Sequence, residues 1–402
     1  MSLDLTAFDF ALKEYYTDDM IEKLTLTDHA LLALLIKMEN FKGDKLPVPV
    51  VYGGPQGRSA VFATAQTNQT TTKGIKFELT RARDYAVSAI DGETIDASDD
   101  NMGAFIEAQT TEFDCAFDSI AHSCASALYR AGTGSIGVVG SLSTSTLTLA
   151  TTADVANFEV GMTLTAHATD GGAAIDSGAT EVVAGVDRDA GTLTSTSADW
   201  TTNLSSLAAT NYLAVEGDLN AKIKGLDSWL PATVTATTHF GVNRTADAVR
   251  LGGNRYDASS DPIEEGLVTA AAKAANWGAR LTHYFVSYDR YADIEHALGS
   301  KARYDTARAS AEIAFQALVV NGPRGPIKVV PDALCQDAIG WGLDLNTWKL
   351  YSLGKCPRFL VRDGAGQTLR QASADGEEFR IGYYAQLGCR APGWNTRVTL
   401  PT

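Results

Sequence analysis

The glycine-rich segment Gly132–Gly137 (GTGSIG) has the spacing of a dinucleotide-binding loop, and Asp154 lies 17 residues beyond its last glycine, near the place of a ribose-binding acid. Such a loop holds a pyrophosphate only when a strand precedes it and a helix N-terminus follows it, because free helix amides bind the phosphate. Here the periodicity predicts a long helix before the glycines and a strand after them. The segment is therefore predicted to end a helix rather than to bind a nucleotide.

The other side chains with catalytic or metal-binding chemistry lack the spacing that a site requires. The six histidines, at positions 29, 122, 167, 239, 283 and 296, form neither an HExxH pair nor another paired metal motif. His122 lies four residues after Asp118, a spacing typical of a contact on a helix surface. The sequence contains neither a nucleophile elbow nor a Walker motif. We therefore predict no catalytic residue, no cofactor-binding residue and no metal ligand, and hence no enzyme.

Composition, cysteines and charge restrict the class of protein. A chain of 402 residues that is 45% apolar is expected to form two or three domains with large cores. Its five cysteines, an odd number without close pairs, are typical of reduced thiols in a cytosolic setting. The N-terminus lacks a signal-peptide core, and no apolar run approaches the roughly 18 to 20 residues of a membrane helix. The net charge of −15 argues against a protein that mainly binds nucleic-acid phosphates.

Charge is distributed unevenly along the chain. Residues 1–132 carry a net charge of −9, residues 133–218 also carry −9, and residues 219–402 carry +3. The middle segment has a single basic residue, Arg188, and 25 of its residues are Ser or Thr. Short alternating runs of Thr, Val and Leu between Gly and Asp turns predict that 133–218 is an all-β barrel or sandwich. Because it directly follows a predicted long helix, we interpret it as an insertion into a larger domain.

Residues 41–84 are predicted to form a long two-stranded hairpin. The strands are LPVPVVY (46–52) and IKFELTR (75–81), and the two prolines exclude the first strand from the centre of a sheet. A hairpin of this size has too little core to stand alone, so it is expected to lie on another domain or another subunit. Residues 41–85 carry a net charge of +4, which favours an intersubunit contact, although a solvated loop is the alternative. The candidate contact residues are Arg58, Lys73, Lys76, Arg81 and Arg83.

Helical periodicity is clearest from about residue 102 to residue 130, which predicts a helix about 40 Å long. Asp99 and Asp100 precede it, where carboxylates cap free amides; a metal-binding role for this pair is the weaker alternative. A strand is predicted over 85–90. The first 40 residues are expected to form an acidic arm followed by a short helix, His29–Met38.

From residue 219 onward the pattern mixes helices and strands. Asp261 is predicted as the N-cap of a helix that runs to about Trp277, with Pro262 at its first position. A buried strand at 281–287, a helix at 289–298, and strands at 318–321 and 327–330 follow. The chain closes with a hairpin around Asp363 and with the strands RIGYYAQLG and TRVTL.

This order of elements resembles the major capsid proteins of tailed bacteriophages, which have the Hong Kong 97 fold. The resemblance is carried by FELTRARDYAVSAIDGETI (77–95) with the following helix, by FGVNRTADAVRLGGNRYDASSDPIEEGL (240–267) and by IKVVPDALCQDAIGWGLDLNTWKLYSLG (327–354). It covers most of the chain outside 133–218. It is a resemblance of organisation and of sequence texture, because this family has no invariant catalytic motif.

The resemblance implies an α+β capsid chain of six parts. These are an N-terminal arm (1–40), an extended loop (41–84), a peripheral domain with a spine helix (85–132), the inserted β domain (133–218), an axial domain (219–375) and return strands of the peripheral domain (376–402). Some family members cross-link covalently through Lys and Asn, and no motif settles whether Lys73 or Lys76 could do so.

The resemblance also implies a function and a set of partners. Copies of the chain would form hexamers and pentamers of an icosahedral head around double-stranded DNA, built in the host bacterial cytoplasm and present in the virion. Expected partners are a portal and, in some family members, scaffolding or decoration proteins, with DNA only in non-specific proximity and no membrane. Another phage structural or surface β protein, such as a tail tube or an adhesin-like protein, is the alternative.

Overall fold

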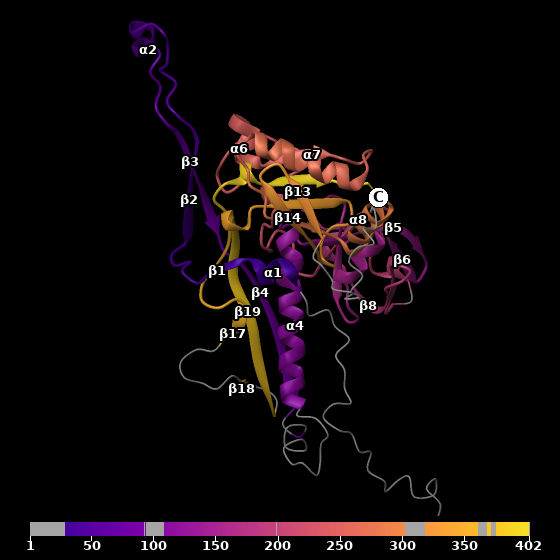
Figure 1. Ribbon diagram of the computed structural model, residues 1–402. Coiled ribbons are helices and arrows are strands. Elements are labelled where there is room, and N and C mark those ends of the chain that lie inside the picture. Colours follow the sequence, from indigo (N-terminus) through magenta and orange to yellow (C-terminus); the bar gives the residue numbers. More distant parts are fainter. Residues whose placement is uncertain are drawn as a thin grey trace, which may run out of the picture. The chain divides into compact units, whose positions relative to one another are not determined.

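The computed structural model describes residues 29–91, 93, 108–197, 199–301, 318–360, 368–370 and 375–401 (Figure 1). These residues fall into two compact units. The smaller unit contains the described parts of 85–122 and 357–382. The larger unit contains those of 28–84, 123–356 and 383–402.

The smaller unit is built from part of a long helix and from antiparallel strand pairs. Its elements belong to β4 (Ala82–Asp91), α4 (Ala108–Tyr129), β17 (Arg358–Phe359), β18 (Thr368–Arg370) and β19 (Gly376–Cys389). Both β17 and β18 pair antiparallel with β19, with Phe359 opposite Ile381 and Leu369 opposite Glu378. The predicted start of the long helix at 102–107, its capping pair at 99–100 and the hairpin turn at Asp363 lie outside the described residues.

A six-stranded mixed sheet forms the main layer of the larger unit, in the order β11-β20-β15-β12-β14-β13. The central strand β12 lies parallel to β14 and antiparallel to β15. Its residues Tyr284, Phe285 and Val286 are fully buried, as expected for a strand that is covered on both faces. The strands are β11 (Asn254–Asp257), β12 (His283–Val286), β13 (Val319–Gly322), β14 (Gly325–Pro331), β15 (Ile339–Leu343) and β20 (Thr396–Thr399).

Helix α7 (Ile263–Asn276) packs on this sheet through an apolar stripe. Its buried residues recur at helical spacing and include Ile263, Leu267 and Ala270. The predicted N-cap is wrong: Asp261 accepts a hydrogen bond from the Tyr256 hydroxyl, and the helix begins after Pro262 without a side-chain cap. The other helical elements are α5 (Leu226–Trp229), α6 (Ala248–Gly252), α8 (Tyr288–Lys301) and the 3-10 turns η5 (Arg244–Asp247), η6 (Leu345–Thr347) and η7 (Pro392–Trp394).

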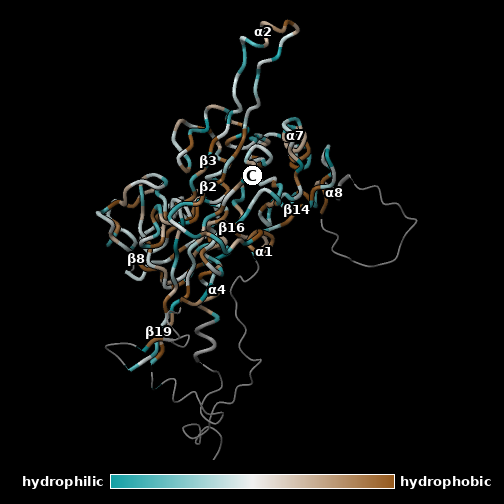
Figure 2. Tube along the Cα trace, turned by 90° about the vertical axis from the view of Figure 1, so that its left-hand side faces the viewer, coloured by the Kyte–Doolittle hydropathy of each residue, from teal (hydrophilic) through white to brown (hydrophobic). Residues whose placement is uncertain are grey.

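Residues 135–215 form a closed barrel in the order β10-β5-β6-β9-β8-β7. Its interior is a separate cluster of buried apolar residues that includes Leu147, Phe158 and Trp200. A Cβ on Gly137 would lie 2.8 Å from the Phe158 ring, so glycine permits this close packing. Hydrophilic and hydrophobic residues are interleaved around β8 in Figure 2. The elements are β5 (Ser135–Ser143), β6 (Thr146–Leu149), η2 (Thr152–Asn157), β7 (Thr163–His167), η3 (Ile175–Gly178), β8 (Thr180–Asp187), β9 (Thr192–Ser195), η4 (Trp200–Thr202) and β10 (Tyr212–Val215).

The segment His29–Met38 is not one helix. Helix α1 (Ala30–Leu34) ends at Leu35, whose backbone is extended, and β1 (Ile36–Met38) follows. The strand lies parallel to β16 (Trp348–Ser352), with Ile36 opposite Lys349. Backbone pairing with this distant strand outweighs the local helical pattern.

The closing strands do not stay in one sheet. β19 pairs with β16 through Cys389 opposite Trp348, whereas β20 pairs with β11 and β15 of the mixed sheet. The return strands predicted over 376–402 therefore divide between two sheets, because 396–399 joins the mixed sheet. Likewise, β16 does not join the mixed sheet that contains most strands of 219–375. Sheet membership depends on long-range partners, which local alternation does not reveal.

Candidate intersubunit surface

The hairpin of β2 (Lys45–Gly53) and β3 (Lys73–Thr80) is a two-stranded sheet that no other described strand joins. Lys45 lies opposite Thr80 and Gly53 lies opposite Lys73. β2 has no second strand partner among the described residues, which accommodates Pro47 because proline cannot donate to a ladder. Helix α2 (Phe62–Thr67) lies at the free end of the hairpin (Figure 1). The sequence pattern did not predict this helix.

The base of the hairpin is part of the chain's own core. Val48, Phe77 and Leu79 are buried. The Phe77 ring meets the Trp229 ring edge-on, with centroids 5.0 Å apart. The Glu78 amide donates to the Phe240 carbonyl at 3.0 Å. The base therefore fixes the hairpin to the larger unit by apolar packing and by backbone hydrogen bonds.

The free end of the hairpin, in contrast to the base, exposes its apolar side chains. Phe62 is 81% exposed, Val51 is 69% exposed and Val61 is 58% exposed, and α2 has no buried residue. Residues 54–72 contain one charged side chain, Arg58. Figure 2 shows hydrophobic residues at this end, near the label α2. Large apolar side chains gathered on an exposed element are typical of a contact surface for another molecule.

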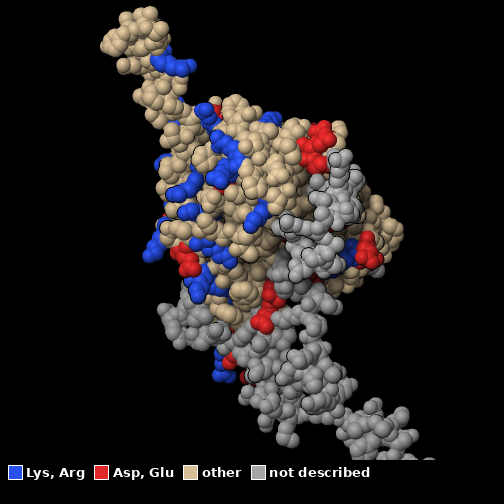
Figure 3. Space-filling model, viewed as in Figure 1, with Lys and Arg blue, Asp and Glu red and all other residues tan. Residues whose placement is uncertain are grey.

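The five predicted contact residues do not share one environment. Arg58, Lys73 and Arg83 are exposed, and so is Lys76, whose Nζ lies 3.1 Å from a carboxylate oxygen of Glu78. Lys45 binds the same carboxylate at 2.9 Å, and these contacts lower the pKa of Glu78. Figure 3 shows that the projecting end is mostly uncharged on the viewed face, and that Lys and Arg side chains gather below it.

Arg81 has an internal role. Its Nη1 donates to the Phe41 carbonyl at 2.9 Å and also to the Gly43 carbonyl, and its guanidinium lies 5.0 Å from the centre of the Phe41 ring. Phe41 is fully buried. Arg81 therefore ties the end of β3 to the segment that enters β2. Sequence reasoning grouped it with exposed cations because charge counting does not show which way a side chain turns.

Phe62 and Val61 are the residues that sequence reasoning missed. They lie inside a run that is otherwise small and polar, SAVFATAQTNQ (59–69). The signal was available, since they are the only large apolar residues between Gly54 and Thr72. The predicted contact surface rested on charge, and the structure shows in addition that large apolar side chains are exposed at the free end of the hairpin.

A buried histidine lies beside the hairpin base. His239 packs edge-on against Trp229 and Phe240, with centroids 4.7 and 4.5 Å away, and its Nδ1 lies 3.2 Å from the Ser228 hydroxyl. Burial lowers its pKa well below the ordinary value, and the nearby cations Arg244 and Lys224 lower it further. Burial also lowers the pKa of Arg244 to about 10.

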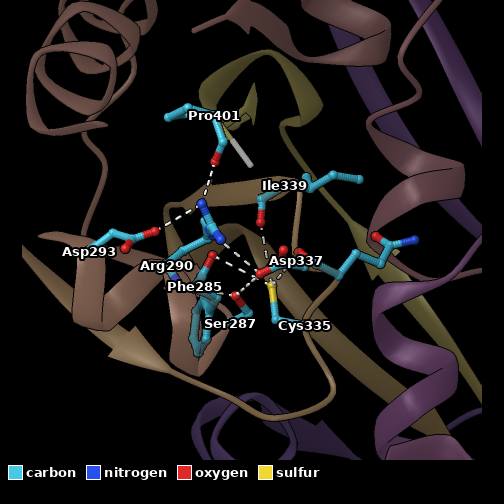
Figure 4. A network of polar contacts seen from close by, with 9 residues as sticks. Phe285, Ser287, Arg290, Asp293, Cys335, Asp337, Ile339 and Pro401 are labelled. Atoms are coloured by element: carbon cyan, nitrogen blue, oxygen red, sulfur yellow. Dashed lines mark hydrogen bonds and ion pairs between the residues drawn. The ribbon is translucent and has the colours of Figure 1, made fainter. Parts of the chain in front are cut away.

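A network of hydrogen bonds and ion pairs joins α8, the residues before β15 and the last described residues of the chain. Figure 4 shows Arg290 between Asp337, Asp293 and the Pro401 carbonyl, with contacts of 3.2, 2.8 and 2.6 Å. Burial raises the pKa of the Cys335 thiol well above its usual range, which opposes nucleophilic reactivity. This network fixes the start of α8 and the C-terminal residues in place. Its two carboxylates neutralise the partly buried guanidinium of Arg290.

Two further observations concern only the described residues. No group of three or more His, Cys, Asp or Glu among them could hold a metal ion. No helix within these ranges has the length and apolarity needed to cross a membrane.

Comparison with known proteins gives matches at the level of structure. No protein-family profile matches the chain, and no curated protein matches it either. The capsid asymmetric unit of cyanophage A-1(L) is similar over 96% of each chain, with a TM-score of 0.61 and 13% identity. The capsid of a native GTA particle aligns over 100% of both chains, with a TM-score of 0.54 and 10% identity. A structure from Mycobacterium phage Ogopogo also aligns over 100% of both, with a TM-score of 0.50 and 9% identity.

These likenesses extend over nearly the whole of each chain, so they concern the architecture and not one shared domain. The mixed helix and sheet content is that of the capsid structures. The chain has the fold of phage capsid proteins.

Proposed function

We propose that this chain is the major capsid protein of a tailed-phage head. Copies assemble into hexamers and pentamers of an icosahedral shell around double-stranded DNA, and the role is structural rather than enzymatic. The observation that carries the proposal is the hairpin, whose base is built into the core while Phe62 remains 81% exposed at the free end. Such an end is stable when a neighbouring copy covers it, and a shell supplies that neighbour at every position.

The parts of the Hong Kong 97 fold are assigned within this proposal. The hairpin in 41–84 is the extended loop, and 85–132 with the main part of 376–402 is the peripheral domain. Residues 219–375 form the axial domain, which also receives β20, and β16 joins the sheet of β19. Residues 1–40 are the N-terminal arm.

The barrel is assigned as a domain inserted at 133–218. The Asn220 amide donates to the Thr133 carbonyl at 2.8 Å, and the Gly225 amide donates to the Arg130 carbonyl at 2.9 Å. The chain therefore enters and leaves the barrel side by side, which is the geometry that an insertion needs. Because the segment carries a charge of −9 and almost no basic residue, we assign it to the outer face of the shell, away from DNA.

The partners follow from assembly. The shell would contain a portal and, in some systems, scaffolding or decoration proteins, and it would be built in the host cytoplasm before it becomes part of the virion. The net charge of −15 keeps an enclosing wall from binding packaged DNA tightly. Contact with DNA would be non-specific proximity.

Negative-stain electron microscopy of the overexpressed full chain tests the proposal. We expect closed shells, or rings of five and six copies. Tubes or fibres would favour the alternative, a tail-tube or adhesin-like protein. Small uniform oligomers without a lattice would contradict both. A Phe62→Asp variant tests the role of the exposed end. It changes that end without touching the core, so it should give folded chains that do not form shells.

A further inference from the structure

His239 is an ionisable group inside an apolar cluster. It is 5% exposed and is surrounded by the rings of Trp229, Phe240 and Phe77. Its Nδ1 has the Ser228 hydroxyl as a partner, whereas its Nε2 is buried without a hydrogen-bond partner among the described residues. His167, which is also buried, differs: its Nε2 meets the Thr165 hydroxyl and its Nδ1 meets the Gly172 carbonyl.

The loop that carries His239 holds the hairpin. The His239 amide donates to the Val242 carbonyl at 2.9 Å, and the Val242 amide donates back at 3.0 Å. Between them Phe240 has a φ of 47°, a conformation that costs free energy for a bulky side chain. In this conformation the Phe240 carbonyl accepts the Glu78 amide of β3. The histidine ring and the strained turn therefore form one clamp on the hairpin base.

The charged groups around this clamp do not favour a protonated histidine. Arg244 donates to the carbonyls of Ser228 and Trp229, and Lys224 lies 5.0 Å from the Phe240 ring centre. The carboxylates on neighbouring elements have other partners: Glu78 of β3 binds Lys45 and Lys76, and Asp227 of α5 binds Arg397. The rings that β3 and β16 contribute, Phe77 and Trp348, are uncharged. An added proton would thus place a third positive charge in the apolar cluster, where burial is costly.

We propose that His239 is a pH-sensitive lock on the base of the hairpin: the neutral ring holds the 239–242 turn against β3, and protonation opens the clamp and lets the hairpin change its angle. The lock concerns the single chain. Its consequence, an intersubunit arm that is released by acid, rests on the function proposed above.

The sign of the pH dependence follows from the environment of the ring. Burial, then Arg244 and Lys224, lower the pKa of His239 from its ordinary value of 6.5. The open form regains that ordinary value, so protons bind the open form more tightly. The clamp is fully stable above about pH 6.5, and its opening equilibrium rises about tenfold for each pH unit between 6.5 and the lowered pKa.

Hydrogen exchange of the full chain, measured by mass spectrometry at pH 7.5 and 5.0 and corrected for intrinsic rates, tests the lock. We expect peptides covering 75–80 and 237–244 to exchange at least about tenfold faster at pH 5.0, whereas barrel peptides around His167 do not. His239→Phe keeps an aromatic ring without a titrating group and should abolish the acceleration. His283→Phe is the matched control, because the ring of His283 on β12 contacts Thr282 and Phe285 rather than the clamp residues, and its loss should leave the acceleration unchanged.

An acceleration that persists in His239→Phe would overturn the proposal. If that variant does not fold, the ring of His239 is titrated in the wild-type chain by carbon-13 NMR. A midpoint clearly below 6.5 that coincides with the exchange of 75–80 supports the lock, and a midpoint at or above 6.5 overturns it. None of these readouts needs a shell, so a failure of the lock is distinct from a failure of the proposed assembly.

Discussion

The barrel and the hairpin are both small β structures, but they bury their apolar side chains in opposite ways. The barrel closes its six strands on themselves and buries its own cluster of apolar side chains. The hairpin has two strands, buries apolar residues only at its base, and exposes Phe62 and Val61 at its free end. Closure removes the free edges of a sheet, whereas a two-stranded hairpin retains both.

Under the proposed function, this difference predicts which region depends on other copies of the chain. The barrel is complete within one chain, so its surface is free to vary without affecting its fold. The hairpin is stable at one end because of Trp229 and Phe240, and the other end has nothing to pack on within the described residues. A region that is half core and half contact surface can be tested by mutating each half separately.

The largest effect is expected at the hairpin base. Phe77→Ala removes a fully buried ring from the Trp229 cluster, and such truncations cost about 3–5 kcal/mol of unfolding free energy. Urea denaturation followed by circular dichroism measures this loss. A loss below about 1 kcal/mol would mean that the base is not part of the core, and the contrast with the barrel would disappear.

The independence of the barrel predicts a smaller effect. Replacing 133–218 by a linker of about four Gly and Ser residues should leave the rest of the chain folded, because Thr133 and Asn220 are already hydrogen-bonded neighbours. The deletion removes the Arg130–Asp154 ion pair at 2.8 Å and the Ser126–Asn157 hydrogen bond at 2.7 Å. We expect a loss of about 1–3 kcal/mol in the same urea assay. An unfolded product would show that the barrel supports the sheet domains.

Local sequence patterns predicted elements whose partners lie close by or whose burial is periodic. The stripe of α7 and the alternation in β6 and β9 follow directly from helical and strand periods. Local patterns did not predict the structure where a segment pairs with a strand that is distant in the sequence. Ile36–Met38 became a strand because β16 offers a parallel edge, and 396–399 joined β11 and β15 although the sequence shows no preference between two sheets.

The same limit applies to the candidate intersubunit surface, whose contact residues remain a prediction. The hairpin and its excess of basic residues were visible in the sequence. The direction of Arg81 toward Phe41 was not, because it depends on a ring that becomes buried only in the folded chain. His239 carried no motif, and its significance comes from the cluster of rings that the fold assembles around it.

A substitution of Phe62 tests the exposed free end of the hairpin separately from its buried base. Phe62→Ser should change the unfolding free energy by less than about 0.5 kcal/mol, because the ring is 81% exposed. The same variant should lose most of its shells in electron micrographs if a neighbouring copy covers the ring. Ala65→Ser, on the same short helix, is the control and should assemble normally. Normal shells from Phe62→Ser would remove the apolar end from the interface.

The charges of the hairpin give the smallest expected effect on folding. Arg58→Glu, Lys73→Glu and Lys76→Glu together alter exposed side chains only, so the unfolding curve should be nearly unchanged. Assembly should nevertheless fail at low salt, because the reversed charges recur at every interface and weaken attraction to acidic neighbours.

Salt separates this charge contribution from the apolar one. The screening length falls from about 10 Å at 0.1 M to about 3 Å at 1 M salt, so the triple variant should approach wild-type assembly rates at 1 M, whereas Phe62→Ser should not. Arg188→Glu in the barrel, an exposed reversal outside the hairpin, is the matched control and should assemble at all salt concentrations. Light scattering during assembly measures these rates. If the triple variant assembles normally at low salt, the basic residues are a solvated surface, and the hairpin contacts its neighbour through the apolar end alone.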